Sequence, residues 1–477
     1  MSPGTARLWS LDAFRGLTIA AMLLVNNPGR WSDTFIYPPL RHAAWNGWSP
    51  TDLIFPNFLF IVGVALVFSF TRRLEGGTSR GQLWNHVWRR SLVLVLLGLF
   101  LSRFPGYPRA AAGLGSAVAA AGPGGLLLRV GWLAGFVASV AFLIGPRHHR
   151  PWLLVLIGGA VFVLLGQVLA LPPDRGWLWH HLGSARVPGV LQRIGICYAA
   201  AGGLYLLSNR PRFVTGTIIL LLTVTAVWMR LVPIPGFGFP DLSIGLIGPG
   251  EPDVSATAVA ANWCAYVDRH VFGIRCLHSL VDPDSRALVW TFDPEGLAST
   301  PAALATMMVG VLCGIWLRRQ QPSPQQKLAG LTAAAVALFL GGALLGVWLP
   351  INKQLWTSSF ALLTAGLALA VLAILFGVME ICRWRRWAMP LIWYGRNAIT
   401  AFFLSSLAAR LLVAVMVPTS GPEGAIQYMT LQTWIFETWF LPWTAPRNAS
   451  LLYALSVVLF WTLFCWLLYR RRIFLKI

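Results

Sequence analysis

A histidine between two long apolar runs is the residue in this sequence whose surroundings most suggest chemistry. His42 lies in the stretch L-R-H-A-A-W-N-G-W, with Asn26 and Asn27 before it and Asn46 and Asp52 after it. An imidazole accepts a proton near neutral pH, a carboxylate can orient it, and an amide can stabilise an oxyanion. The set therefore fits general-base catalysis. The alternative is an interfacial histidine that bonds a loop carbonyl.

Other polar residues also lie in or beside apolar runs, where membrane proteins seldom place them without a function. Asp293, Glu295, Asn352 and Lys353 fall on the same side as His42, Arg193, Arg396 and Asn397 lie deeper, and Asp12 and Arg15 lie at the opposite end. A water-filled path through a helical bundle would accommodate this spread. For Asp12 and Arg15, three residues apart, the alternative is a local ion pair on one helix face.

Several other kinds of chemistry lack their signatures here. No two histidines have the spacing of a zinc site, so we expect no metal. Neither a G-x-S-x-G nucleophile motif nor a phosphate-binding G-x-x-x-x-G-K-[ST] loop occurs. The net charge of +21 comes from small basic clusters between apolar runs. That distribution orients a membrane protein and does not indicate nucleic-acid binding.

The elements that must position these residues are membrane-spanning helices. The 477 residues include 11% charged residues and have a mean hydropathy of +0.66, whereas a soluble protein carries about 25% charged residues. Met1–Leu11 has no pattern of a cleaved signal. We predict a single all-α polytopic domain over residues 1–477. The predicted runs are Leu11–Asn27, Thr51–Phe70, Ser91–Leu101, Leu126–Ile144, Pro151–Leu171, Val187–Leu207, Val214–Leu231, Pro301–Leu317, Leu328–Leu349, Leu355–Glu380, Ala388–Val417 and Leu451–Leu468.

The basic clusters predict the topology. About twelve spans with both termini cytoplasmic place every strong cluster inside and His42 outside. The stretch Val232–Thr300 is then one long extracytoplasmic loop, which holds eight of the sixteen acidic residues and fits a small cap. Cys264 and Cys276 lie in this loop, where they either pair as a disulfide or remain free.

Six motifs resemble one family, the bacterial relatives of the lysosomal transmembrane heparan-α-glucosaminide N-acetyltransferase. They are L-D-A-F-R-G (11–16), V-N-N-P-G (25–29), L-R-H-A-A-W-N-G-W-S-P-T-D-L-I-F-P (40–56), R-V-P-G-V-L-Q-R-I (186–194), F-D-P-E-G (292–296) and P-I-N-K-Q-L-W-T-S-S-F (350–360). They span most of the chain in the family's order. The resemblance implies transfer of acetyl from cytoplasmic acetyl-CoA to the amino group of a glucosamine-type sugar on the far side of the membrane.

The resemblance also implies roles for particular residues. His42 matches the active-site histidine and acts as general base, and Asn26 matches the active-site asparagine, with Asn27 as the alternative. The remaining roles are hypotheses within that frame. Asn46, Asp52, Asp293, Glu295, Asn352 and Lys353 would line the sugar side, and Arg15, Arg193, Arg396 and Asn397 would contact CoA. The arginines could instead form structural pairs in the bundle.

The same resemblance implies a homodimer in the inner membrane of a bacterial cell, with an amino sugar or glycan as acceptor. This sequence departs from the family by an insertion of two probable helices over residues 110–184 and by the absence of the lysosomal relatives' luminal domain before the first motif. Direct transfer and an acetyl-histidine intermediate both remain possible. A secondary transporter of sugars or glycan fragments and a glycan O-acetyltransferase are the alternative functions.

Overall fold

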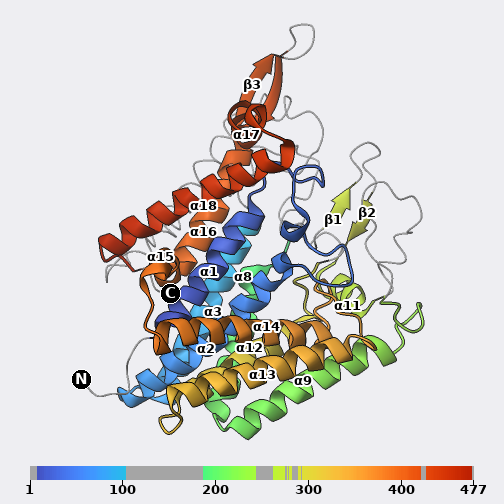
Figure 1. Ribbon diagram of the computed structural model, residues 1–477. Coiled ribbons are helices and arrows are strands. Elements are labelled where there is room, and N and C mark those ends of the chain that lie inside the picture. Colours follow the sequence, from blue (N-terminus) through green and yellow to red (C-terminus); the bar gives the residue numbers. More distant parts are fainter. Residues whose placement is uncertain are drawn as a thin grey trace. The chain divides into compact units, whose positions relative to one another are not determined.

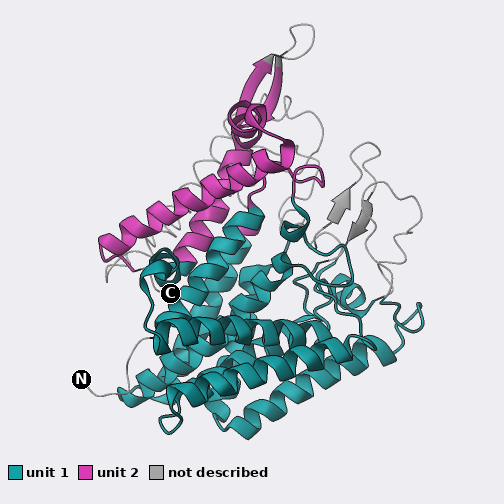
Figure 2. Ribbon diagram, viewed as in Figure 1, with its two compact units in different colours: residues 1–26, 37–99, 186–398 teal, residues 27–36, 100–185, 399–477 magenta. Residues whose placement is uncertain are grey.

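A computed structural model describes residues 8–103, 186–242, 262–273, 277, 279–281, 288–291, 293–420 and 426–474. The described chain is mostly helical (Figure 1). It divides into two compact units (Figure 2). Unit 1 comprises residues 1–26, 37–99 and 186–398, and unit 2 comprises residues 27–36, 100–185 and 399–477.

Unit 1 contains the helices that position His42. They are α1 (Trp9–Asn26), α2 (Ile54–Glu75), α3 (Arg80–Arg103), α8 (Val190–Leu207), α9 (Pro211–Leu231), α11 (Trp263–Phe272), α12 (Thr300–Arg318), α13 (Pro324–Leu345), α14 (Ser358–Phe376) and α15 (Met389–Arg396). Two short 3-10 turns, η1 (Pro38–Leu40) and η2 (Pro50–Leu53), flank the His42 loop, and η2 leads directly into α2. The π-turn η4 (Gly377–Ile381) extends α14, and η5 (Arg386–Ala388) precedes α15.

Glycines let the central helices of unit 1 pack backbone against backbone. A side chain at Gly63 of α2 would collide with the Met307 carbonyl of α12, and one at Gly310 of α12 would collide with the Phe60 carbonyl of α2. Small residues at helix crossings are typical of bundles in lipid, where close van der Waals packing holds helices together. The α2–α12 pair is therefore a tight scaffold directly beyond the His42 loop.

Helix α3 packs antiparallel along α8 in the same manner. A side chain at Gly195 would approach the Ser91 carbonyl, one at Gly202 would approach Val87, and Gly98 of α3 accommodates the Gln192 side chain. These contacts follow one face of α8, because positions three or four apart lie on the same side of a helix.

Each predicted run overlaps a helix, except for the fourth and fifth, which lie outside the described residues together with the predicted insertion at 110–184. The eleventh run is not one helix: α15 ends at Arg396 and α16 (Ala398–Ala414) begins after Asn397. Glycine and asparagine favour helix ends, so G-R-N at 395–397 explains the break. In the described part, seven helices are long and apolar enough to cross a membrane, or eight if this pair is one span.

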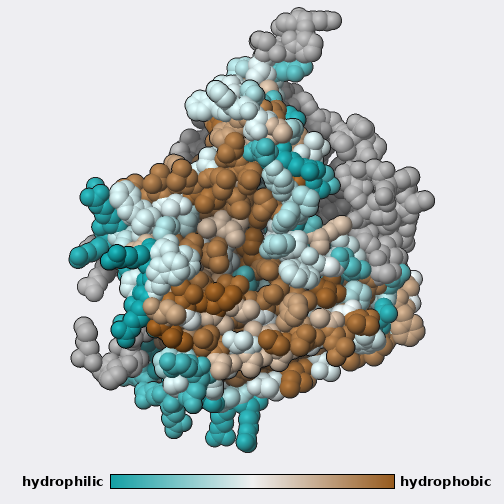
Figure 3. All heavy atoms as spheres, in the orientation of Figure 1, coloured by the Kyte–Doolittle hydropathy of each residue, from teal (hydrophilic) through white to brown (hydrophobic). Residues whose placement is uncertain are grey.

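Exposed apolar side chains support the membrane assignment. Leu340, Leu344 and Val347, on or just after α13, are all more than half exposed. Figure 3 shows a broad apolar surface over this part of unit 1. Apolar side chains exposed in such numbers are suited to contact with lipid acyl chains. The chain is thus a multi-pass helical membrane protein, while the count of twelve spans and the side of each terminus stay predictions.

The long loop 232–300 contains no membrane-spanning helix among its described residues. Helix α11 lies in it, and β1 (Ser279–Val281) pairs antiparallel with β2 (Leu288–Thr291). Cys264 in α11 is a buried thiol whose nearest polar partner is the Leu355 carbonyl oxygen, at 3.8 Å. The possible pairing with Cys276, which the sequence left open, stays open because Cys276 lies outside the described residues.

Unit 2 contains α16, the hairpin β3 (Met416–Ser420) and β4 (Ile426–Thr430), α17 (Leu431–Trp439) and α18 (Pro446–Arg470). A 3-10 turn, η7 (Leu441–Trp443), joins α17 to α18. Phe436, Ala449 and Tyr453 form its small buried cluster, with Phe35 packed against them. Gly29 approaches the Phe436 ring so closely that no side chain would fit there.

Candidate active site

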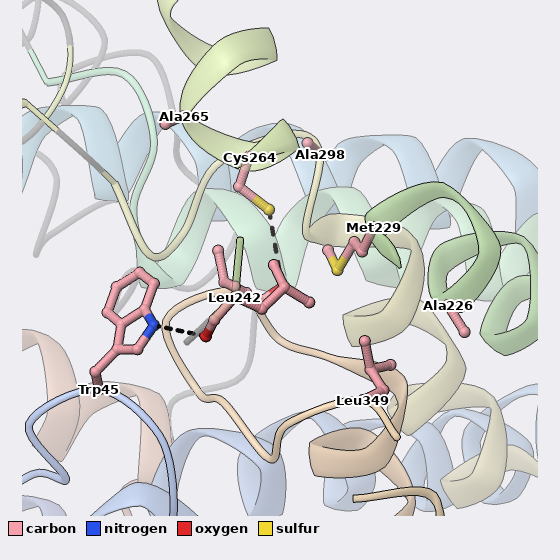
Figure 4. Packing of buried hydrophobic residues seen from close by; sticks show 9 residues of the cluster. Trp45, Ala226, Met229, Leu242, Cys264, Ala265, Ala298 and Leu349 are labelled. Carbon is pink, nitrogen blue, oxygen red and sulfur yellow. Dashed lines mark hydrogen bonds between the residues drawn. The ribbon is translucent and has the colours of Figure 1, made fainter. Parts of the chain in front are cut away.

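An apolar cluster anchors the loop that carries His42. The cluster consists of Trp45, Ala226, Met229, Leu242, Cys264, Ala265, Ala298, Leu349 and Leu355 (Figure 4). Trp45, three residues after His42, is 6% exposed and donates its indole N–H to the Leu242 carbonyl oxygen at 3.2 Å. Burial of a tryptophan contributes several kcal/mol at about 25 cal/mol per Å² of apolar surface. The loop is therefore held in place by Trp45, while the His42 side chain remains 45% exposed.

Asp52 is fully buried at the start of the η2–α2 helical segment. Its Oδ2 accepts bonds from the backbone N–H of Ala43 (3.0 Å) and of Ser49 (2.9 Å) and from the Ser49 hydroxyl (3.0 Å). Ser49 and Asp52 form a capping box. A carboxylate is stabilised at a helix N-terminus by the orphan N–H groups and the helix dipole. Asp52 is thus a fixed anion, oriented by the backbone.

His42, Asp52 and Lys353 meet in one compact cluster. The Asp52 Oδ1 lies 2.7 Å from the His42 Nδ1 and 3.2 Å from the Lys353 Nζ. The Lys353 Nζ lies 2.8 Å from Nδ1 and 3.4 Å from Nε2 of His42. When the Nδ1–H donates a hydrogen bond to Asp52, Nε2 keeps its lone pair and can act as a base. Lys353 competes for the same ring nitrogen and the same carboxylate oxygen.

An amide pair brings Lys353 to this cluster across more than 300 residues of sequence. The Asn352 side chain donates to the Asn46 Oδ1 at 3.1 Å, and the Gly47 N–H donates to the Ile351 carbonyl oxygen at 2.7 Å. Asn352 also accepts the N–H of Leu355 at 2.9 Å and is fully buried. The Asn46–Asn352 pair therefore joins the His42 loop to the turn that carries Lys353.

Arg186 is a residue that the sequence reasoning did not select. Its guanidinium binds both carboxylate oxygens of Asp293, at 2.7 and 2.8 Å, and also pairs with Glu295. Burial raises the pKa of Asp293, but the hydrogen bonds and charge of Arg186 outweigh it and hold that pKa below its ordinary value. This clamp ties the segment before α8 to the turn before α12. A basic residue just before an apolar run was the available signal.

Arg193, on α8, is fully buried. Its Nη2 donates to the Gly296 carbonyl oxygen at 2.7 Å and to the Ser299 hydroxyl. Its guanidinium lies over the rings of Phe55 (6.0 Å) and Trp356 (5.3 Å), a cation–π arrangement that stabilises a desolvated cation. Arg193 thus contacts both Phe55 of α2, the helix that follows Asp52, and Trp356, in the turn between Lys353 and α14. This enclosed position does not resemble an open phosphate site.

Trp356 occupies the left-handed backbone region, with φ of 49°. A bulky residue in this region costs about 1–3 kcal/mol and persists only where its surroundings fix it. Its indole N–H donates to the Thr306 hydroxyl at 3.3 Å, and its ring is 1% exposed. Such strain is commonest at functional sites, and here it shapes the turn that presents Lys353.

Asp268 is a second buried acid, on α11 beside the Gly296 turn. Its Oδ1 accepts the Leu297 N–H at 2.7 Å, whereas Oδ2 has no hydrogen-bond partner in the described chain. Burial raises the pKa of Asp268 to about 6, against the opposing effects of the Leu297 bond and the Arg193 charge.

Several buried polar atoms without a described partner follow the contact between α3 and α8. They are the Ser91 hydroxyl, the Arg90 Nε, the Gln192 amide nitrogen and the Tyr198 hydroxyl. Tyr205, two turns further along α8, differs because its hydroxyl bonds that of Thr71 at 3.3 Å.

The remaining predicted site residues lie on α1 and at the break between α15 and α16. Asn26 ends α1 with an exposed side chain. Arg15 pairs with Asp12 at 3.4 Å and donates to the Gly395 carbonyl oxygen at 3.2 Å, so the local ion pair is confirmed. Arg396 and Asn397 lie at the α15–α16 break, where Asn397 is fully buried. Among the described residues, no group of three acidic, histidine or cysteine side chains could hold a metal ion.

These features define a multi-pass helical membrane protein with a His–Asp–Lys cluster at the outer end of its predicted topology. Residues 7–106, which include His42 and Asp52, match the family model described as heparan-alpha-glucosaminide N-acetyltransferase, catalytic. The chain is 26% identical over 500 residues to the heparan-alpha-glucosaminide N-acetyltransferase of Homo sapiens and 25% identical to that of Mus musculus. Each alignment covers 99% of this chain and 60% of the relative, so the chain spans about three fifths of the length of these relatives. The chain is therefore similar to heparan-α-glucosaminide N-acetyltransferases along nearly its whole length.

Proposed function

We propose that the protein is a transmembrane N-acetyltransferase that moves acetyl from acetyl-CoA to the amino group of a glucosamine-type sugar. The observation that supports this most is the 2.7 Å contact between His42 Nδ1 and the buried Asp52. It leaves Nε2 of a half-exposed imidazole available as a base. The names of the two relatives indicate the type of reaction and the sugar, and the His42–Asp52 pair supplies the group that can perform the proton transfer.

His42 Nε2 would remove a proton from the acceptor amine as that amine attacks the thioester carbonyl carbon. The resulting imidazolium is stabilised by Asp52, whose charge is fixed by Ala43 and Ser49. His42 then protonates the departing thiolate of CoA. Asn26 would bind the developing oxyanion or position the acetyl group. Asp293 would not bind the sugar. Its pair with Arg186 would instead hold the segment before α8 against the turn before α12.

Acetyl-CoA would supply an activated acyl group, and the residues around the site would orient it. Arg193 lies too deep for a phosphate, and we assign it to the support of the His42 and Lys353 segments. Direct transfer in a ternary complex fits a half-exposed base whose ring is held by a carboxylate. In the predicted topology, the acetyl donor comes from the cytoplasm and the acceptor from the opposite side.

The test is acetyl transfer by the purified protein in nanodiscs, with radiolabelled acetyl-CoA and a panel of glucosamine-type sugars. We expect N-acetylated product with the unchanged protein and a loss of about 10²–10⁴-fold with His42→Ala, the usual contribution of a general base. Glu75→Gln is the matched control, because Glu75 pairs at the surface with Arg318. Full activity of His42→Ala would refute the assignment, and labelled His42 without acceptor would favour an acetyl-histidine route.

A further inference from the structure

Lysine is rare in this chain. Of its 37 basic lysine and arginine residues, only Lys327, Lys353 and Lys476 are lysines. One of these three lies against His42. Arginine keeps its charge in proteins and cannot serve as an amine nucleophile, whereas a lysine can lose its proton. The position therefore carries a primary amine in a protein that otherwise uses arginine.

The Lys353 amine lies within hydrogen-bond reach of the proposed base. Its Nζ is 3.4 Å from His42 Nε2 and 2.8 Å from Nδ1, and its side chain is 16% exposed. A sugar amine must approach the same imidazole to be deprotonated. Proton transfer takes place over about 2.6–3.2 Å between heavy atoms, so the 3.4 Å from Lys353 Nζ to Nε2 must shorten slightly before transfer. The Lys353 amine thus lies close to the position that the amine of the sugar acceptor must take.

We propose that Lys353 is acetylated by the protein itself when no sugar acceptor is bound. This inference rests on the proposed acetyltransferase function. The Lys353 ammonium gives one proton to His42, and the free amine attacks the carbonyl carbon of the acyl thioester. The C–S bond breaks and CoA leaves as a thiol, taking the second amine proton. His42 releases the first proton to water, and Lys353 remains as an uncharged acetyl-amide.

Asp52 is the group that opposes this reaction. Its Oδ1 lies 3.2 Å from Lys353 Nζ and forms an ion pair with the ammonium, which is not a nucleophile. Acetylation removes that charge, so the ion pair is lost and the carboxylate is left to His42 alone. The modified protein should therefore differ in transfer rate from the unmodified one, and bound amino sugar should protect Lys353 by taking its place at His42.

The experiment uses the full chain in nanodiscs with isotope-labelled acetyl-CoA and no acceptor, followed by peptide mass spectrometry. We expect one acetyl group on Lys353, at an occupancy at least about tenfold above that of Lys327, because a general base contributes about 10²–10⁴-fold. Lys327 is the internal control, since its amine donates to the Leu317 carbonyl oxygen at 2.8 Å, away from His42. We expect His42→Ala to reduce the Lys353 occupancy to the level of Lys327, and glucosamine to slow its acetylation.

The same preparations are assayed for glucosamine acetylation, which separates the two proposals. If glucosamine is acetylated while Lys353 is modified no more than Lys327, the inference about Lys353 is wrong and the proposed function stands. If His42→Ala leaves the Lys353 occupancy unchanged, the modification is non-enzymatic and the inference is also wrong. If neither amine is acetylated, the proposed function fails together with it.

Discussion

Asp52→Asn is the sharpest perturbation of the proposed mechanism, because it removes one charge and preserves shape. The carboxylate accepts bonds from Ala43 and Ser49 through Oδ2 and faces His42 and Lys353 through Oδ1. An asparagine has only one accepting oxygen. The backbone donors fix that oxygen on their side, so the amide NH₂ faces the His42 Nδ1. Nδ1 must then accept a bond, and the ring proton moves to Nε2.

A ring protonated at Nε2 cannot act as the base there. The expected loss in kcat is about 10²–10⁴-fold, which corresponds to about 3–5 kcal/mol of transition-state stabilisation at 1.36 kcal/mol per tenfold. The acceptor KM should change little, because Asp52 is fully buried and does not face the acceptor directly. The assay is initial-rate transfer of labelled acetyl from acetyl-CoA to glucosamine in nanodiscs.

Glu75→Gln, which removes an exposed carboxylate from the same helix, should leave kcat unchanged. Unfolding is followed in parallel to confirm that Asp52→Asn is folded at the assay temperature. A folded Asp52→Asn protein with kcat within about threefold of the unchanged protein would refute the proposed role of Asp52, since even the lower bound for a general base is about 10²-fold.

Three further predictions concern the surroundings of the site. The pKa of Asp268 is raised to about 6 from 3.8, so its contribution to stability is present below pH 3.8 and is lost as the pH rises through 6. The unfolding free energy of Asp268→Asn, compared with that of the unchanged protein, should therefore be higher above pH 6 than at pH 4, by up to about 3 kcal/mol. Chemical unfolding across that pH range measures the difference. Tyr198→Phe should stabilise the protein by about 1 kcal/mol because it removes an unpartnered buried hydroxyl, while Tyr205→Phe should destabilise it by about as much; equal thermal shifts in both would contradict the difference. Arg186→Met should lower the unfolding free energy by about 3–5 kcal/mol, because it leaves the buried Asp293 charge unpaired, and Asp293→Asn added to Arg186→Met should restore part of that loss.

The sequence predicts the local parts of the site better than the distant ones. His42 and Asp52 are ten residues apart, with a loop and a helix start between them, so their meeting follows from local chain geometry. Lys353 meets them only because the Asn46–Asn352 pair joins two distant turns. Both asparagines were expected to line the sugar side, and the sequence contains no sign that their amides bond each other.

Charge pairing across the bundle is the other feature that sequence reasoning misses. Asp293 and Glu295 were expected to face a sugar, yet both pair with Arg186. The sequence shows an acid-rich turn and a nearby basic residue but not their distance. The helical runs, in contrast, follow directly from hydropathy. The break at Asn397 does not, because apolar residues continue on both sides of G-R-N.

Helix α1 is held against α15 by a close glycine contact near the start of α1. A side chain at Gly16 would collide with the Leu391 carbonyl of α15, and one at Gly395 would collide with the Asp12 carbonyl of α1. Asn26 lies about 15 Å further along α1 at 1.5 Å per residue, so a tilt of about 4° at the glycines moves it by about 1 Å. A displacement of about 1 Å at a reacting group can cost about 100-fold in rate. A single methyl group at position 16 or 395 would therefore displace Asn26, the residue proposed to bind the oxyanion, from the far end of the helix.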